Sequence, residues 1–212
     1  MNTAHPSLST TGQPQALDIA ALLGPAAWQK LSPAIRRRFA SHHAPVCYAG
    51  QMELRASALG RVFACFAQLL GSPLAGRRVG LVPTQVQVYG DEQGGVVWQR
   101  QLGTPGGAGS QLVRSTKRLG PSGRLEECTD GGLSMDLEVC VESGALVFYS
   151  RRYFCLLGRW RLPVPALLTP GVCRVEHRDV APGQFRFTMT MQHPLWGQTF
   201  HQSGIFLDPE ES

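Results

Sequence analysis

Two predicted β-hairpins bring side chains that could bind or catalyse close to apolar rows. In the first, Ser143-Gly144 is a two-residue turn that would set Asp136 opposite Arg151. The same register turns Ser150 and Arg152 towards the apolar face. An arginine in that place would have one of two roles. It would lie at the rim of the core, solvated or paired with a carboxylate, or it would hold the anionic head group of a ligand at the mouth of a pocket.

The second hairpin joins residues 172–180 to residues 185–192, and its register has two solutions. The second run carries an apolar row of alternate residues, Phe185, Phe187, Met189 and Met191. An unbulged turn would set Glu176 beside this row, whereas a one-residue bulge would set His177 there, and burial favours the bulge. In either register one ionisable residue approaches the core, where it would serve a structural hydrogen bond or acid–base chemistry.

The sequence lacks the motifs of the common catalytic and metal sites. It has no P-loop, no dinucleotide-binding glycine motif, no nucleophile elbow and no HExxH zinc motif. Its six cysteines are scattered without a CxxC pair, and the spacing of His193 and His201 around a proline and a glycine suits no common metal site. We therefore predict structural thiols, no metal site and no cofactor.

The composition is that of a globular protein with a skewed basic charge. The chain has 212 residues, of which 43% are hydrophobic and 17% charged, and a formal net charge of +5. Of the 20 basic residues, only Lys30 and Lys117 are lysines. The arginines form small clusters on separate predicted elements rather than one stripe, which argues against nucleic-acid binding. The length suits one domain.

The N-terminal segment, residues 1–14, is rich in Ser, Thr and Pro and lacks the basic and apolar regions of a secretory signal. The most apolar run, residues 59–70, is interrupted by Arg61 and is too short to span a bilayer. We therefore expect residues 1–16 to be a frayed tail and residues 17–208 to form a single domain. We also expect a soluble, cytoplasmic protein with no transmembrane segment and with reduced cysteines.

Helices are expected at the start of the chain and strands thereafter. A serine N-cap followed by proline predicts a helix over 33–41, and alternation predicts a strand over 46–54. An apolar stripe predicts a helix over 57–70, which Gly71-Ser72-Pro73 would end. From residue 79 onwards, turn signals separate short alternating runs. We predict an α+β fold, in which short N-terminal helices and one apolar helix pack on a curved, mainly antiparallel sheet. The sheet would have about eight to ten strands and form an open or partial barrel.

An ordered series of residues along nearly the whole chain carries a family resemblance. The series opens with LGPAAW at residues 23–28 and YAGQM at residues 48–52. It continues with Trp98, Arg100, Leu157-Gly158, Leu162-Pro163, Pro170, Glu176, Phe185, Phe187, Pro194, Gly197 and Gly204. The chain resembles the bacterial domain-of-unknown-function family 4166 over residues 22–207, although its His201-Gln202-Ser203-Gly204 departs from the aromatic residue that the family tends to have there. Members occur alone or behind saccharopine-dehydrogenase-like reductase domains. The resemblance therefore implies a reductase encoded nearby as a partner, but no established activity.

Our leading hypothesis is a binding module for a hydrophobic small molecule, with or without an acidic group, in a sheet-lined pocket. The candidate ligand-binding residues are Arg152, Glu176, His177, Arg100, Trp98, Tyr48 and Ser150. One alternative is a small enzyme with Glu176 or His177 as the acid–base and Arg152 or Arg100 as an anion clamp, which requires these groups to share one cavity. A second alternative is an interaction module that docks on a reductase through an Arg-rich outer face.

Overall fold

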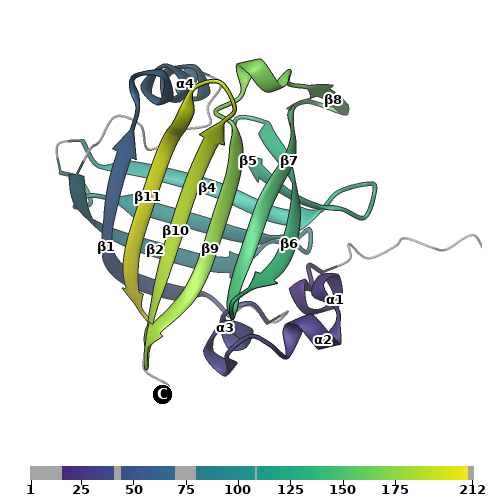
Figure 1. Ribbon diagram of the computed structural model, residues 1–212, viewed down its shortest axis with the longest axis vertical. Coiled ribbons are helices and arrows are strands. Elements are labelled where there is room, and N and C mark those ends of the chain that lie inside the picture. Colours follow the sequence, from purple (N-terminus) through teal and green to yellow (C-terminus); the bar gives the residue numbers. More distant parts are fainter. Residues whose placement is uncertain (1–15, 41–43, 70–79, 108, 210–212) are drawn as a thin grey trace, which may run out of the picture.

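Ten β-strands form a closed barrel in the computed structural model (Figure 1), which describes residues 16–40, 44–69, 80–107 and 109–209. The described strands are β1 (Val46–Ala56), β2 (Gly80–Gly90), β3 (Val96–Leu102), β4 (Gln111–Leu119), β5 (Leu125–Thr129), β6 (Leu133–Glu142), β7 (Ala145–Leu157), β8 (Trp160–Pro163), β9 (Val172–Ala181), β10 (Gln184–His193) and β11 (Gly197–Leu207). Around the ring the order is β6-β5-β4-β3-β2-β1-β11-β10-β9-β7, and β7 pairs again with β6. Each pairing is antiparallel, and β8 pairs only with the end of β7.

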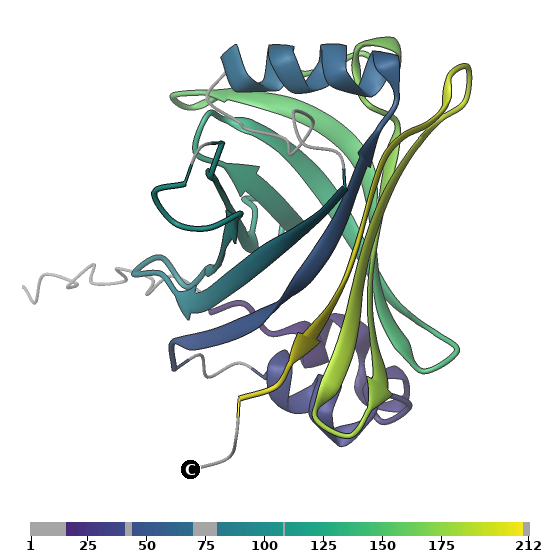
Figure 2. The same ribbon diagram turned by 90° about the vertical axis from the view of Figure 1, so that its left-hand side faces the viewer.

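The helices lie at the two ends of the barrel rather than on a sheet face. Helices α1 (Ile19–Leu23), α2 (Pro25–Trp28) and α3 (Pro33–Arg38) gather at one end, and α4 (Ala58–Leu69) lies at the other (Figure 2). The fold is therefore mainly β, and the predicted α+β class with an open or partial barrel is wrong. Closing the sheet removes its edges and also the open concave face that helices would have covered. The prediction of a large antiparallel sheet is confirmed.

The β6–β7 hairpin follows the predicted register for only part of its length. Ser143-Gly144 has φ angles of 47° and 78°, as a type I′ turn requires. The register holds as far as Leu137 opposite Ser150, but a β-bulge then shifts the pairing, so that Asp136 lies opposite Arg152. Since an extra residue reverses the direction of every later side chain, the expected inward position of Arg152 is wrong.

The β9–β10 hairpin adopts the bulged register that burial favoured. The register shifts between Gln184 and Phe185, and Phe187 then lies opposite His177. His177 consequently enters the barrel and is 2% exposed, whereas Glu176 points to the outer face. The unbulged alternative, with Glu176 beside the apolar row, is wrong.

Helix α3 closes one end of the barrel. The Ser32 hydroxyl accepts a hydrogen bond from the Ile35 N–H at 3.1 Å, which confirms the predicted N-cap, and the helix ends at Arg38, sooner than expected. Phe39, just beyond it, packs against Trp98 with ring centroids 5.6 Å apart. The Arg38 guanidinium binds Asp208 at 2.8 Å and lies 3.8 Å from the centre of the Phe185 ring. This ion pair fixes the helix across the barrel opening.

Helix α4 does not bury its large apolar stripe. Its inner side consists of small residues, and Gly60 lies so close to β11 that a Cβ atom there would be 2.1 Å from the Thr199 carbonyl oxygen. Val62 and Phe66 are 49% and 61% exposed. The expectation that a sheet covers the broad apolar face of this helix is therefore wrong. The predicted helix stop at residues 71–73 and the tail before residue 16 lie outside the described residues.

Replacing Phe39 with alanine should destabilise the barrel by about 3–5 kcal/mol, because the cavity would open between buried aromatic rings. Phe66→Ala is the matched control, since the same truncation at an exposed position should change the free energy of unfolding by at most about 0.5 kcal/mol. Urea unfolding of both variants measures the difference. Equal effects of the two substitutions would show that α3 does not plug the barrel.

Candidate functional site

A cavity of about 90 Å³ lies inside the barrel, beyond an aromatic layer next to α3. That layer contains Phe39, Trp98, Phe148, His177, Phe185 and Phe187. The cavity wall is largely apolar, with Leu102, Val113, Met135, Val175, Met189 and Met191. A single water molecule needs a cavity of about 10–15 Å³, so this cavity is large enough for a ligand of several atoms.

A buried ion pair stands at the polar side of this cavity. Lys117 Nζ lies 3.1 Å from Glu127 Oε2, and the Ser115 hydroxyl donates a hydrogen bond to Glu127 Oε1 at 2.6 Å. Burial alone would raise the pKa of Glu127, but the charges of Lys117 and Arg100 and the hydrogen bonds lower it overall. Burial lowers the pKa of Lys117. Strands β4 and β5 present these groups side by side, because Ser115, Lys117 and Glu127 all occupy inward positions.

Arg100 on β3 adds a second cation to the same side. Its Nη1 donates one long hydrogen bond, 3.4 Å, to the Ser115 hydroxyl, and its guanidinium carbon lies 5.7 Å from the centre of the Phe187 ring. Burial lowers the pKa of Arg100, yet an arginine keeps its charge in a protein. Within the described chain, Glu127 is the one carboxylate that acts on Arg100 and Lys117 in this interior. The cluster therefore has an excess positive charge.

Arg114 also lines the cavity, but its side chain is 43% exposed and lies 4.0 Å from Asp130. The Cys173 thiol and the Tyr153 hydroxyl are neutral. Burial raises the pKa of the Cys173 thiol to about 12 and also raises the pKa of the Tyr153 hydroxyl. Tyr153 donates its hydrogen bond to the Gly171 carbonyl at 3.0 Å. Neither group can neutralise Arg100 at physiological pH. A ligand in the cavity would thus face apolar walls on most sides and a guanidinium on one side.

His177 belongs to the aromatic layer. Its ring centroid lies 4.8 Å from that of Phe39 and 5.3 Å from that of Phe187, and its Nδ1 has no hydrogen-bond partner in the described part of the chain. Burial, followed by the charges of Arg38, Lys117 and Arg100, holds the pKa of His177 well below its ordinary value. The ring is therefore neutral at physiological pH.

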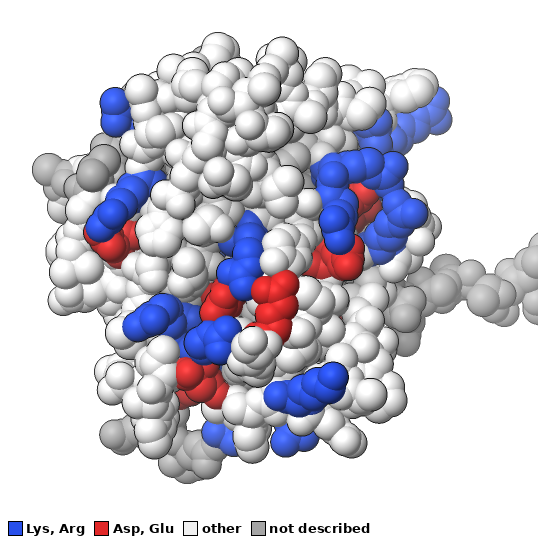
Figure 3. All heavy atoms as spheres, viewed as in Figure 1, with Lys and Arg blue, Asp and Glu red and all other residues white. Residues whose placement is uncertain are grey.

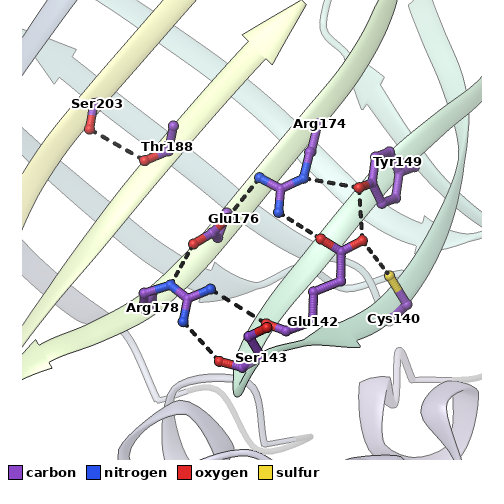
Figure 4. Close-up of polar contacts among 9 residues, drawn as sticks. All are labelled: Cys140, Glu142, Ser143, Tyr149, Arg174, Glu176, Arg178, Thr188 and Ser203. Carbon is purple, nitrogen blue, oxygen red and sulfur yellow. Dashed lines mark hydrogen bonds and ion pairs between the residues drawn. The ribbon is translucent and has the colours of Figure 1, made fainter.

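Two of the predicted site residues lie on the outer surface. The Arg152 side chain is 67% exposed and pairs with Asp136 at 3.0 Å. Glu176 binds Arg174 and Arg178, each at 2.7 Å, in a surface network shown in Figure 4. Acidic and basic groups alternate across this face (Figure 3), so most of its arginines are matched by carboxylates. The enzyme hypothesis required an acid–base and an anion clamp in one cavity. Glu176 and Arg152 lie outside the barrel, whereas His177 and Arg100 both line a cavity of about 10 Å³ in the aromatic layer.

The other five predicted residues lie inside the barrel, but of the seven only Arg100 lines the larger cavity of about 90 Å³. Trp98 and His177 belong to the aromatic layer, and Tyr48 packs on Phe185 with ring centroids 5.2 Å apart. Burial raises the pKa of Tyr48 to about 12. The Ser150 hydroxyl accepts a hydrogen bond from the Cys173 N–H at 2.8 Å.

Sequence reasoning missed the ion pair that stands beside Arg100. The alternation of Val113, Ser115 and Lys117 along β4 places three residues on one face, and Glu127 has the corresponding position on β5. The sequence signal was a lysine and a glutamate on neighbouring strands, each at a position where the alternation of apolar residues points into the core. Antiparallel pairing of β4 with β5 places Lys117 opposite Glu127.

The described residues offer few other places for cofactor chemistry. Among them, no three or more His, Cys, Asp or Glu side chains lie close enough together to hold a metal ion. All six cysteines are free thiols. No helix in the same residues has the length and apolar character needed to cross a membrane.

A comparison with protein families assigns nearly the whole barrel to one family. Residues 31–206 match the family model described as Domain of unknown function (DUF4166). This range covers the ten strands of the barrel except for Leu207, the last residue of β11. No curated protein matches the sequence.

Mild acid should destabilise the protein through His177. Because its pKa is lowered in the folded state, the unfolded chain binds the proton first. Stability is then lost as the pH falls below about 6.5, by up to about 1.4 kcal/mol per pH unit. Urea unfolding between pH 7.5 and 5.5 should show this slope in the wild type and a smaller slope in His177→Leu. The same slope in both proteins would contradict a neutral His177.

Proposed function

The chain belongs to the domain-of-unknown-function family DUF4166, and we propose that its barrel is a binding module for a small, mainly apolar molecule with an anionic group. The cavity lies within an antiparallel barrel of ten strands, an architecture whose interior is wide enough to hold a ligand. The lining combines apolar side chains with a few polar groups at one side, as small-molecule sites commonly do.

The observation that carries this proposal is the Arg100 guanidinium. Removing such a charge from water costs several kcal/mol unless a partner compensates it. Arg100 has five N–H donors, and its one described hydrogen bond is the long contact to Ser115. A carboxylate in the cavity would accept two parallel hydrogen bonds from this fork and neutralise the excess charge.

The remaining walls favour an apolar body on the ligand. Met135, Met189 and Met191 contribute flexible, polarisable side chains that adapt to ligands of different shape. Lys117 is paired with Glu127, and the half-exposed Arg114 lies beside Asp130. Arg100 is therefore the cation that we expect to select the anion. The expected ligand is therefore a short-chain or compact organic acid rather than a highly charged metabolite.

Calorimetric titration with linear carboxylates from butanoate to decanoate tests the proposal. We expect at least one chain length to bind, with 1:1 stoichiometry, and the alcohol of equal length to bind less tightly. Arg100→Met should weaken carboxylate binding at least tenfold, about 1.4 kcal/mol, and leave alcohol binding nearly unchanged.

Arg152→Met is the matched control, because it removes an exposed arginine from the outer face and should bind like the wild type. If Arg100→Met fails to fold, Arg100→Lys keeps the charge but loses the bidentate fork, and it should still weaken carboxylate binding. A wild type that binds none of the acids, or an Arg100→Met variant that folds and binds them equally, would refute the proposal.

A further inference from the structure

The barrel end that carries α4 exposes a group of large apolar side chains. Its members are Leu59, Val62 and Phe66 of α4, Leu157, Trp160 and Leu162 of the β7–β8 hairpin, Leu167 and Leu168 of η1 (Ala166–Leu168), and Leu195 of the β10–β11 turn. Leu195 is 72% exposed, Leu168 65% and Trp160 64%. Single exposed apolar residues are ordinary, but a group of this size marks a site of interaction. We call these nine residues the apolar end.

Contacts between the four segments show that they lie together at this end of the barrel. Phe63 of α4 packs on Trp196 of the β10–β11 turn with ring centroids 5.7 Å apart. The Thr199 hydroxyl, after that turn, donates a hydrogen bond to the Pro170 carbonyl at 2.5 Å, just beyond η1. Tyr153 of β7 binds the carbonyl of Gly171. Both ribbon views place these segments together at the end opposite α1–α3 (Figures 1 and 2).

The segments that form this end carry charge of one sign, and the acidic Asp130 of the β5–β6 turn lies at their side, in a surface pocket that Leu156 also lines. Residues 56–69, 157–172 and 192–200 contain three arginines and no Asp or Glu. Arg161 pairs with the buried Glu126, whereas Arg61 and Arg159 pair with no carboxylate among the described residues. Arg159 lies 5.4 Å from the centre of the Trp160 ring instead. On the face drawn in Figure 3 the α4 end is mostly uncharged, with basic groups at its sides.

We propose that the apolar end docks on an anionic lipid surface. Leucine, phenylalanine and tryptophan enter the boundary between head groups and acyl chains, and each nearby arginine adds about 1 kcal/mol of attraction to anionic lipid. The exposed side chains project from α4, a hairpin tip, η1 and a turn, so they can enter a fluid surface separately. An acidic partner protein would be selected by complementary charge pairs, and two arginines give few of these.

Flotation with lipid vesicles tests the proposal on the full chain. We expect the wild type to float with phosphatidylcholine vesicles that contain phosphatidylglycerol, and to bind pure phosphatidylcholine vesicles less. A variant with Trp160→Ser, Leu168→Ser and Leu195→Ser should lose at least tenfold in apparent affinity. The matched control, Val180→Ser, Ile205→Ser and Leu207→Ser, removes three exposed apolar residues away from this end and should float like the wild type.

Tryptophan quenching by brominated lipid gives a second readout that does not depend on the triple variant. Vesicle-bound wild type should be quenched, and Trp160→Phe should be quenched less, the remainder coming from Trp196 at the same end. No flotation of the wild type, equal flotation of the two triple variants, or quenching in Trp160→Phe equal to that of the wild type would overturn the proposal. A wild-type dimer that the first triple variant converts to a monomer, without vesicle binding, would show that a second protein copy occupies this surface instead.

Discussion

Pairing between β6 and β7 is the interaction on which the rest of the structure depends, because it joins the two ends of the sheet into a ring. A ring of ten strands encloses more space than its backbone fills, so side chains must occupy the interior and something must cover the ends. At one end, α3 and the residue after it fill the interior and cover the opening. Phe39 enters the aromatic layer, and Arg38 holds the helix to Asp208 and Asp179. Beyond that layer the filling is incomplete, and the cavity beside Arg100 remains.

The polar groups in that interior are not explained by stability. A buried ion pair such as Lys117–Glu127 contributes little compared with apolar residues of similar volume, and an additional buried cation is costly. An interior anion would offset the charge of Arg100. The cavity also extends towards the α4 end, since Pro170 and Met191 belong to its wall. An apolar acid dissolved in lipid would therefore meet the barrel at the end proposed to dock there.

Local signals in the sequence predict much of the strand architecture. Ser32-Pro33 and Ser57 mark the starts of α3 and α4, the Ser143-Gly144 turn sets the first part of the β6–β7 register, and burial selects the bulge that turns His177 inward. These features depend on residues close together in the chain, and their physical rules are local.

The errors arise where distant segments decide the outcome. The bulge near Ser150 has no turn residue to announce it, and it moves Arg152 from the interior to the surface. Closure of the ring requires one further strand pairing, between β6 and β7, in a sheet whose other pairings are already made. The amino-acid composition of a closed barrel does not differ from that of an open sheet in a way that reveals this pairing. The stripe on α4 resembles a core-facing helix, but close approach at Gly60 lets the small residues face the barrel. Of the site, Arg100 was found and its ion-paired neighbours were not.

Native mass spectrometry of protein purified gently from the organism that encodes it tests the central claim most directly, because the ligand need not be known beforehand. The account predicts that the wild type carries one small added mass, that this mass is released on denaturation as an organic acid, and that Arg100→Met purified in the same way lacks it. A wild type with the bare mass of its polypeptide, or the same added mass on both proteins, would contradict the assignment of Arg100 as the anion-binding group.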